Sequence, residues 1–68
     1  MTLKEWMRCN ALTQVVAAEK IGVHQSTVAR WINYQQFPDP IHLVKIKDIT
    51  GGEVTADNLV NEWVEKNG

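Results

Sequence analysis

The sequence predicts an all-α fold, a small bundle of about five short helices, and three observations support this. Apolar residues recur three or four positions apart in several stretches, which is the spacing of one helix face. Residues that favour helix starts precede these stretches at Thr2, Thr13, Asp39 and Thr55. Residues that end helices follow them at Gly22, Pro38 and Gly51.

The length and composition of the chain indicate which classes of protein it can belong to. A chain of 68 residues with 44% hydrophobic residues is expected to fold as one small domain over 1–68. The single cysteine, Cys9, excludes an intramolecular disulfide, and with no signal peptide we expect a reducing cytoplasm. Cys9, His24 and His42 lack the paired spacing of a zinc site. We therefore expect no metal, cofactor or small-molecule ligand, and no apolar run is long enough to span a membrane.

The first helix is predicted near the N-terminus. Thr2 and Glu5 have the spacing of a capping box, in which each side chain accepts a backbone N–H of the other residue. Leu3, Trp6 and Met7 then fall on one face, so Trp6 is expected in the core. The helix should end near Asn10.

The residues from 14 to 33 predict two helices joined by a tight corner. Gly22 can take a positive φ without steric cost, which lets one helix stop at about Ile21 and another begin shortly after. Ala17 and Ala18 are small enough for two helices to cross closely. An apolar frame gives each helix a buried stripe: Ala18, Ile21, Val23, Val28 and Trp31. This arrangement is a helix-turn-helix motif.

The second helix of the motif is predicted from about His24 to Tyr34. Val28, Trp31 and Ile32 should point to the core. The outward face would then hold five side chains without a carboxylate: Gln25, Ser26, Ala29, Arg30 and Asn33. Glutamine pairs with adenine and arginine with guanine in the DNA major groove. The alternative is an ordinary solvent-exposed helix surface that binds no ligand.

At these residues the chain resembles Cro-type repressors of temperate phages. The stretch GVHQSTVARWI is similar to their turn and recognition helix, and the opening TLKEW is similar to their start. The second half, with ITGGEVTADNL, looks more like all-helical prophage Cro and antitoxin-type regulators, so the resemblance implies a lambda-repressor-like bundle. It also implies four base-reading positions, namely Gln25, Ser26, Ala29 and Arg30. Ala29 departs from the longer polar residue of the family, so base preference does not carry over.

Contacts to the DNA backbone are expected around the same helix. By resemblance, Gln14 contacts a phosphate from the first turn of its helix, where backbone N–H groups and the dipole favour an anion. The remaining candidates lie at the start of the next helix and just after it: His24, Thr27, Asn33, Tyr34 and Gln36. Tyr34 is equally suited to packing.

The sequence predicts the secondary structure of the second half of the chain less clearly. Pro40 suits a first helical position after Asp39, and Leu43, Ile46 and Ile49 favour a helix that ends at Gly51. The alternative is an α+β fold with a hairpin at about 41–56. A last helix should follow Thr55 as its cap. This helix has an apolar stripe made of Leu59, Val60, Trp63 and Val64. Part of the stripe should close the core, and the rest, Trp63 above all, could form a dimer contact.

Charge is divided unevenly along the chain. The net charge of −1 is unusual for a DNA-binding domain. Up to Thr50, six basic side chains stand against four acidic ones, whereas from Gly51 onward one basic side chain stands against four acidic ones. The first half is therefore expected to face phosphate, with a shallow salt dependence.

The function that these observations predict is a sequence-specific repressor that binds operator DNA through the helix at about 24–34. We expect a homodimer on a near-palindromic site, weak or formed on DNA, in a bacterial cytoplasm. Within the class, the alternative is a prophage antitoxin or an excisionase-like accessory factor. From another class, the alternative is a helical protein-binding adaptor, which the acidic second half favours. An enzyme is not expected, because no nucleophile with a base and no phosphate-binding glycine loop occurs.

Overall fold

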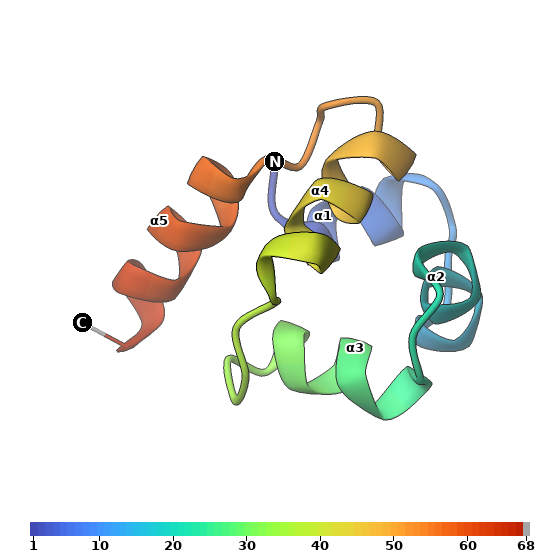
Figure 1. The fold of residues 1–68 in the computed structure, drawn as a ribbon, viewed down its shortest axis with the longest axis horizontal. Helices are drawn as coiled ribbons and strands as arrows, with labels where there is room; N and C mark the ends of the chain where they lie inside the picture. Colours follow the sequence, from blue (N-terminus) through green and yellow to red (C-terminus); the bar gives the residue numbers. More distant parts are fainter. Residues whose placement is uncertain (68) are drawn as a thin grey trace.

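Five α-helices make up the structure, a computed structural model that describes residues 1–67 (Figure 1). They are α1 (Leu3–Cys9), α2 (Gln14–Ile21), α3 (Gln25–Ile32), α4 (Pro40–Ile49) and α5 (Ala56–Asn67). The all-α prediction is thus confirmed. No strand occurs within 1–67, and the alternative hairpin at about 41–56 is wrong, because this range holds most of α4, a turn and the start of α5.

The predicted caps start three of the helices. Thr2 Oγ1 accepts the Glu5 N–H at 3.0 Å, and Glu5 Oε1 accepts the Thr2 N–H at 3.0 Å, which completes the capping box. Thr13 Oγ1 accepts the Val16 N–H at 3.2 Å at the start of α2. Thr55 Oγ1 accepts the Asn58 N–H at 3.2 Å at the start of α5.

The start of α4 differs from the prediction that Asp39 caps it. Asp39 occupies the N-cap position, but its side chain makes no hydrogen bond to the helix. Its Oδ2 instead lies 3.6 Å from His42 Nδ1. Pro40 at the first position of α4 still favours the helix start, because its ring fixes a helical φ and its missing N–H needs no partner there.

The corner between α2 and α3 forms at the predicted glycine. Gly22 takes φ +89°, and its N–H donates to Ala18 O at 2.8 Å. Ala17 and Ala18 are buried beneath the corner, and Val28 of α3 is fully buried. In this part of the structure α2 and α3 pack together through small side chains at a short connection.

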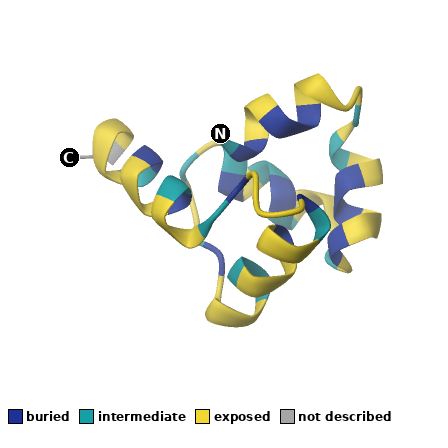
Figure 2. Cartoon of the chain, turned by 90° about the horizontal axis from the view of Figure 1, so that it is seen from above, coloured by how far each residue is buried: buried dark blue, intermediate teal, exposed yellow. Residues whose placement is uncertain are grey.

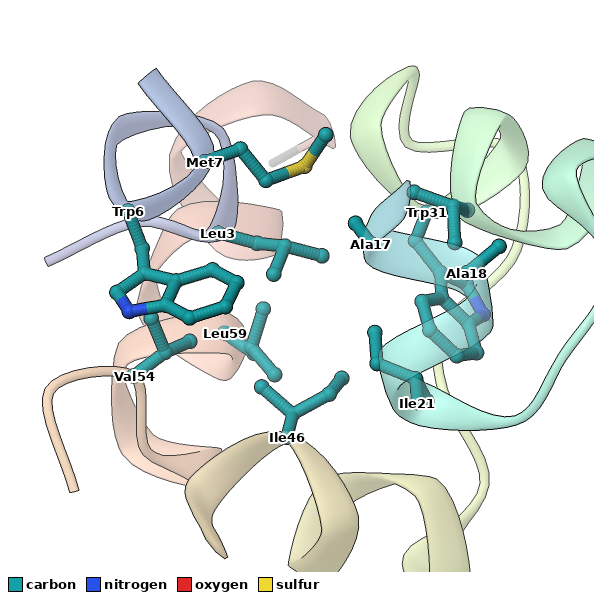
Figure 3. Packing of buried hydrophobic residues seen from close by; sticks show 11 residues of the cluster. Leu3, Trp6, Met7, Ala17, Ala18, Ile21, Trp31, Ile46, Val54 and Leu59 are labelled. Atoms are coloured by element: carbon teal, nitrogen blue, oxygen red, sulfur yellow. The ribbon is translucent and has the colours of Figure 1, made fainter. Parts of the chain in front are cut away.

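All five helices or the turns beside them contribute to one hydrophobic core (Figure 3). Trp6 of α1, Ile21 of α2, Trp31 of α3, Ile46 of α4 and Leu59 of α5 point toward a common centre. Burying a side chain of this size contributes about 1.5–3 kcal/mol relative to exposure. In Figure 2 the buried residues lie mainly where the helices face one another, and most of the outer surface is exposed.

The predicted recognition helix is shorter at both ends than 24–34. His24 is the N-cap of α3, and Asn33 is its C-cap. Tyr34 takes φ +58°, in the left-handed region, so the helical hydrogen bonds cannot continue through it. The sequence has no glycine at this point, so its pattern predicts a longer helix than the structure forms.

Helix α5 lies at the opposite end of the molecule from α2 (Figures 1 and 2). Trp63 packs within the chain, with its ring edge-on to Phe37 at 5.6 Å and to Tyr34 at 6.3 Å between centroids. Leu59 is buried, whereas Val60 and Val64 remain exposed. No helix in residues 1–67 has the length and apolarity that crossing a bilayer requires.

Replacing Gly22 with valine should destabilise the fold. A Cβ at this position would meet its nearest heavy atom, Lys45 Nζ, at an ordinary 3.7 Å, so the penalty comes from the backbone φ and not from a clash. Strain of this kind costs about 1–3 kcal/mol, and each kcal/mol lowers the Tm of a domain of this size by about 4–8 °C. Thermal unfolding followed by circular dichroism measures the change.

Gly22→Asn is the matched control, because asparagine tolerates the left-handed conformation better than other side chains. It should lose less stability than Gly22→Val. An unchanged Tm for Gly22→Val would contradict the proposed strain at the corner.

Candidate nucleic-acid interface

The outward side of α3 presents the predicted side chains to solvent. Gln25, Ser26, Arg30 and Asn33 are exposed, and Ala29 is partly buried. We call these five residues the recognition surface. No carboxylate belongs to it, so nothing on the surface itself would repel a phosphate backbone. Val28 and Trp31 are buried on the opposite side of α3, as predicted, and Ile32 is partly buried against the core.

The N-termini of α2 and α3 lie side by side. Gln14 at the start of α2 and Gln25 at the start of α3 approach each other, with Gln25 Nε2 donating to Gln14 Oε1 at 3.5 Å. The two residues are eleven apart in sequence and are brought together by the corner at Gly22. The start of α2, which is the positive end of its dipole, therefore borders the recognition surface.

His24 and Ser26 form the start of α3. The Ser26 N–H donates to His24 Nδ1 at 3.2 Å, and the Ser26 hydroxyl lies 2.9 Å from the same nitrogen. A ring nitrogen that accepts a hydrogen bond carries no proton, so the neutral ring carries its proton on Nε2. This arrangement leaves the His24 Nε2–H as a donor for a ligand at the start of α3.

The other residues predicted to contact DNA phosphates differ in their exposure to solvent. Asn33 and Gln36 are exposed, and Thr27 is partly buried. Tyr34 is placed differently: its hydroxyl donates to Glu62 Oε1 of α5 at 2.6 Å. Its donor is therefore engaged inside the protein, and a phosphate contact would require that hydrogen bond to break.

Burial and the neighbouring Glu62 raise the pKa of Tyr34 from its ordinary value of 10.0 to about 12. Removal of the proton would place a phenolate beside a carboxylate. Tyr34 therefore remains a hydrogen-bond donor throughout the physiological pH range.

Two basic residues that the sequence analysis did not assign to the site lie next to Gln14. Lys4 and Arg8 of α1 line a surface hollow of about 310 Å³, together with Gln14 and with Ile32 at the end of α3. They are four residues apart, which puts them on one helix face. That spacing was readable from the sequence, but only the fold shows that the face adjoins Gln14.

The corner, the buried α2–α3 contact and the exposed polar side of α3 together define a helix-turn-helix protein. The helix-turn-helix family model matches residues 3–55, which is most of the chain. The chain belongs to this family, whose Cro/C1-type members are regulators that bind DNA. It is thus a sequence-specific DNA-binding regulator of transcription, and its partner is double-stranded DNA. No curated protein and no solved structure matches the chain.

The raised pKa of Tyr34 predicts a stability change at alkaline pH. The folded state holds this proton to about pH 12, whereas the unfolded chain releases it near 10.0. Its contribution is therefore fully present below pH 10 and decreases as the pH rises from about 10 to about 12. Tyr34 is the single tyrosine, so absorbance of the tyrosinate measures it directly.

Glu62→Gln provides the control for this titration. It removes the negative charge beside the hydroxyl and keeps the size of the side chain, so the Tyr34 pKa should fall below the wild-type value. A wild-type midpoint near 10.0 would contradict the partly buried Tyr34–Glu62 hydrogen bond.

Proposed function

We propose that this protein is a Cro-type repressor of a phage or prophage, acting in the bacterial cytoplasm. It occupies an operator with α3 in the major groove and thereby excludes polymerase or a competing regulator. The observation that carries this proposal is the recognition surface itself: an exposed, carboxylate-free side of α3, held outward by a helix that is buried on its other side. A protein-binding adaptor would be expected to expose an apolar patch at this place.

The base contacts are assigned to four residues of the recognition surface. Arg30 is exposed in the last turn of α3 and is suited to bidentate pairing with guanine O6 and N7. Gln25 at the start of α3 is suited to adenine N6 and N7. Ser26 accepts or donates to either base type, and the Ala29 methyl group fits against a thymine methyl.

The backbone contacts surround these base contacts. Gln14, His24 and Thr27 lie at or near the two helix starts, where the positive end of the helix dipole favours a phosphate. Asn33 and Gln36 follow the end of α3. Lys4 and Arg8 extend the contact from Gln14 along α1, because all three line the same hollow. Tyr34 is left out, since its hydroxyl is engaged by Glu62.

The active form on DNA is a homodimer, weak or formed on the operator. Helix α3 has eight residues, and a helix of this length reaches only a few base pairs, too few for useful specificity. Two copies with α3 helices about 34 Å apart read two half-sites. Exposed apolar side chains on α4 and α5 are available for the contact between copies: Ile41, Val44, Val60 and Val64.

Selection of bound duplexes from a random DNA pool tests the whole proposal. Enrichment of a near-palindromic sequence with half-sites one helical turn apart is expected. Enrichment of a single undivided site would contradict the dimer. Failure to enrich any sequence would contradict sequence-specific repression.

Arg30→Ala should weaken binding to the selected operator by about 1–3 kcal/mol and relax the preference at one base pair. Affinity for a set of single-base operator variants, measured by fluorescence anisotropy, provides the test. Equal losses on operator and random DNA would make Arg30 a phosphate contact and contradict its assignment to a base.

Arg8→Ala should instead weaken binding to all duplexes alike. One phosphate contact fewer reduces the slope of log K against log salt by about 1. Lys47→Ala is the matched control for charge, because Lys47 lies in the last turn of α4, at the end away from α3 (Figure 1). An equal effect of both substitutions would show that Arg8 acts only through net charge.

A further inference from the structure

The backbone just after α3 is held in an unusual conformation. Tyr34 follows the C-cap Asn33 and takes φ +58°, a conformation that glycine adopts freely and tyrosine seldom does. Its N–H donates to Trp31 O at 3.3 Å, and the Gln35 N–H donates to Arg30 O at 2.8 Å. These two hydrogen bonds close the helix end in the pattern normally built on a glycine. Adopting this conformation without glycine costs about 1–3 kcal/mol, and contacts of the Tyr34 side chain offset that cost.

Those contacts come from α5. The Tyr34 hydroxyl donates to Glu62 Oε1 at 2.6 Å, across 28 positions in the sequence. The Tyr34 ring is edge-on to Trp63, and Lys66 Nζ lies 6.0 Å from its centroid. Three side chains on two successive turns of α5 therefore contact this one residue just after α3.

Glu62 is an unusual residue for a merely structural position. It is only 8% exposed, and its Oε2 has no hydrogen-bond partner in the part of the chain that the structure describes. A buried carboxylate with one unpaired oxygen is costly compared with an apolar side chain of similar size. What the carboxylate supplies here is one directional acceptor at the Tyr34 hydroxyl.

The same helix end supports the recognition surface. Arg30 O accepts the N–H groups of both Gln35 and Gln36, at 2.8 and 3.3 Å, and the Asn33 N–H donates to Ala29 O at 3.0 Å. The turn that Tyr34 forms is therefore bonded directly to the backbone of two residues that face DNA. A change in the Tyr34 backbone therefore alters the hydrogen bonds that end α3 at Arg30 O and Trp31 O.

We propose that Glu62 is a positioning residue for DNA recognition: through its hydrogen bond to the Tyr34 hydroxyl, it fixes the end of α3 and thereby the placement of Arg30 and Asn33. The proposal rests on the DNA contact assigned above. Under this proposal α5 has a role in specificity. Helix α5 begins at Ala56, after the family match ends at residue 55.

Glu62→Ala, Glu62→Gln and Tyr34→Phe test the proposal, with operator and random duplexes measured in parallel. Glu62→Ala and Tyr34→Phe remove the hydrogen bond and should lower the ratio of operator to random affinity about fivefold or more, since groups in one network are coupled. Glu62→Gln keeps an oxygen acceptor and should retain most of the wild-type ratio. Glu65→Ala is the control, because it removes an equal charge from an exposed position of α5.

A double-substitution cycle separates positioning from stability. In the Glu62→Ala background, Arg30→Ala should reduce the operator-to-random ratio less than it does in the wild type, because Arg30 is already misplaced. Tyr34→Phe keeps the aromatic packing and reports on the hydrogen bond if Glu62→Ala does not fold. An unchanged ratio in folded Tyr34→Phe, or full additivity with Arg30→Ala, would overturn the proposal. Loss of operator preference in the wild type would instead overturn the proposed function.

Discussion

The close approach of α2 and α3 is the contact on which the rest of the structure depends. Gly22 turns the chain, and Ala17, Ala18 and Val28 are small enough to let the two helices touch. This contact decides which side of α3 is buried and therefore which side remains for DNA. It also brings Gln14 next to Gln25, so that the proposed phosphate contact and the proposed base contact lie at the same corner.

The remaining helices complete this unit in different ways. Helices α1 and α4 supply core side chains such as Leu3, Trp6 and Ile46, and α1 adds two basic groups beside Gln14. Helix α5 closes the core with Leu59 and reaches the end of α3 through Glu62. The acidic second half of the chain is thereby partly folded inward, since Glu62 is buried. A net charge of −1 is consequently compatible with a DNA-facing side that has no carboxylate.

Much of the fold was predictable, because residues close together in the sequence determine where its helices begin and end. The capping residues Thr2, Thr13 and Thr55 and the glycines at 22 and 51 set helix bounds close to the observed ones. The end of α3 was not predictable, because Tyr34 adopts a glycine-like φ where the sequence has no glycine, and its side chain is bonded to α5, which is distant in sequence. For the same reason the sequence suggested Tyr34 for phosphate and passed over Glu62. Lys4 and Arg8 were missed because their relation to Gln14 is tertiary.

Dimethyl sulfate footprinting on a selected operator tests most directly whether α3 enters the major groove. The reagent methylates guanine N7 in the major groove and adenine N3 in the minor groove, so it distinguishes the two. Bound protein should protect guanine N7 at two places one helical turn apart and leave adenine N3 reactive between them. Protection of adenine N3 alone, with every guanine N7 still reactive, would contradict major-groove recognition by α3.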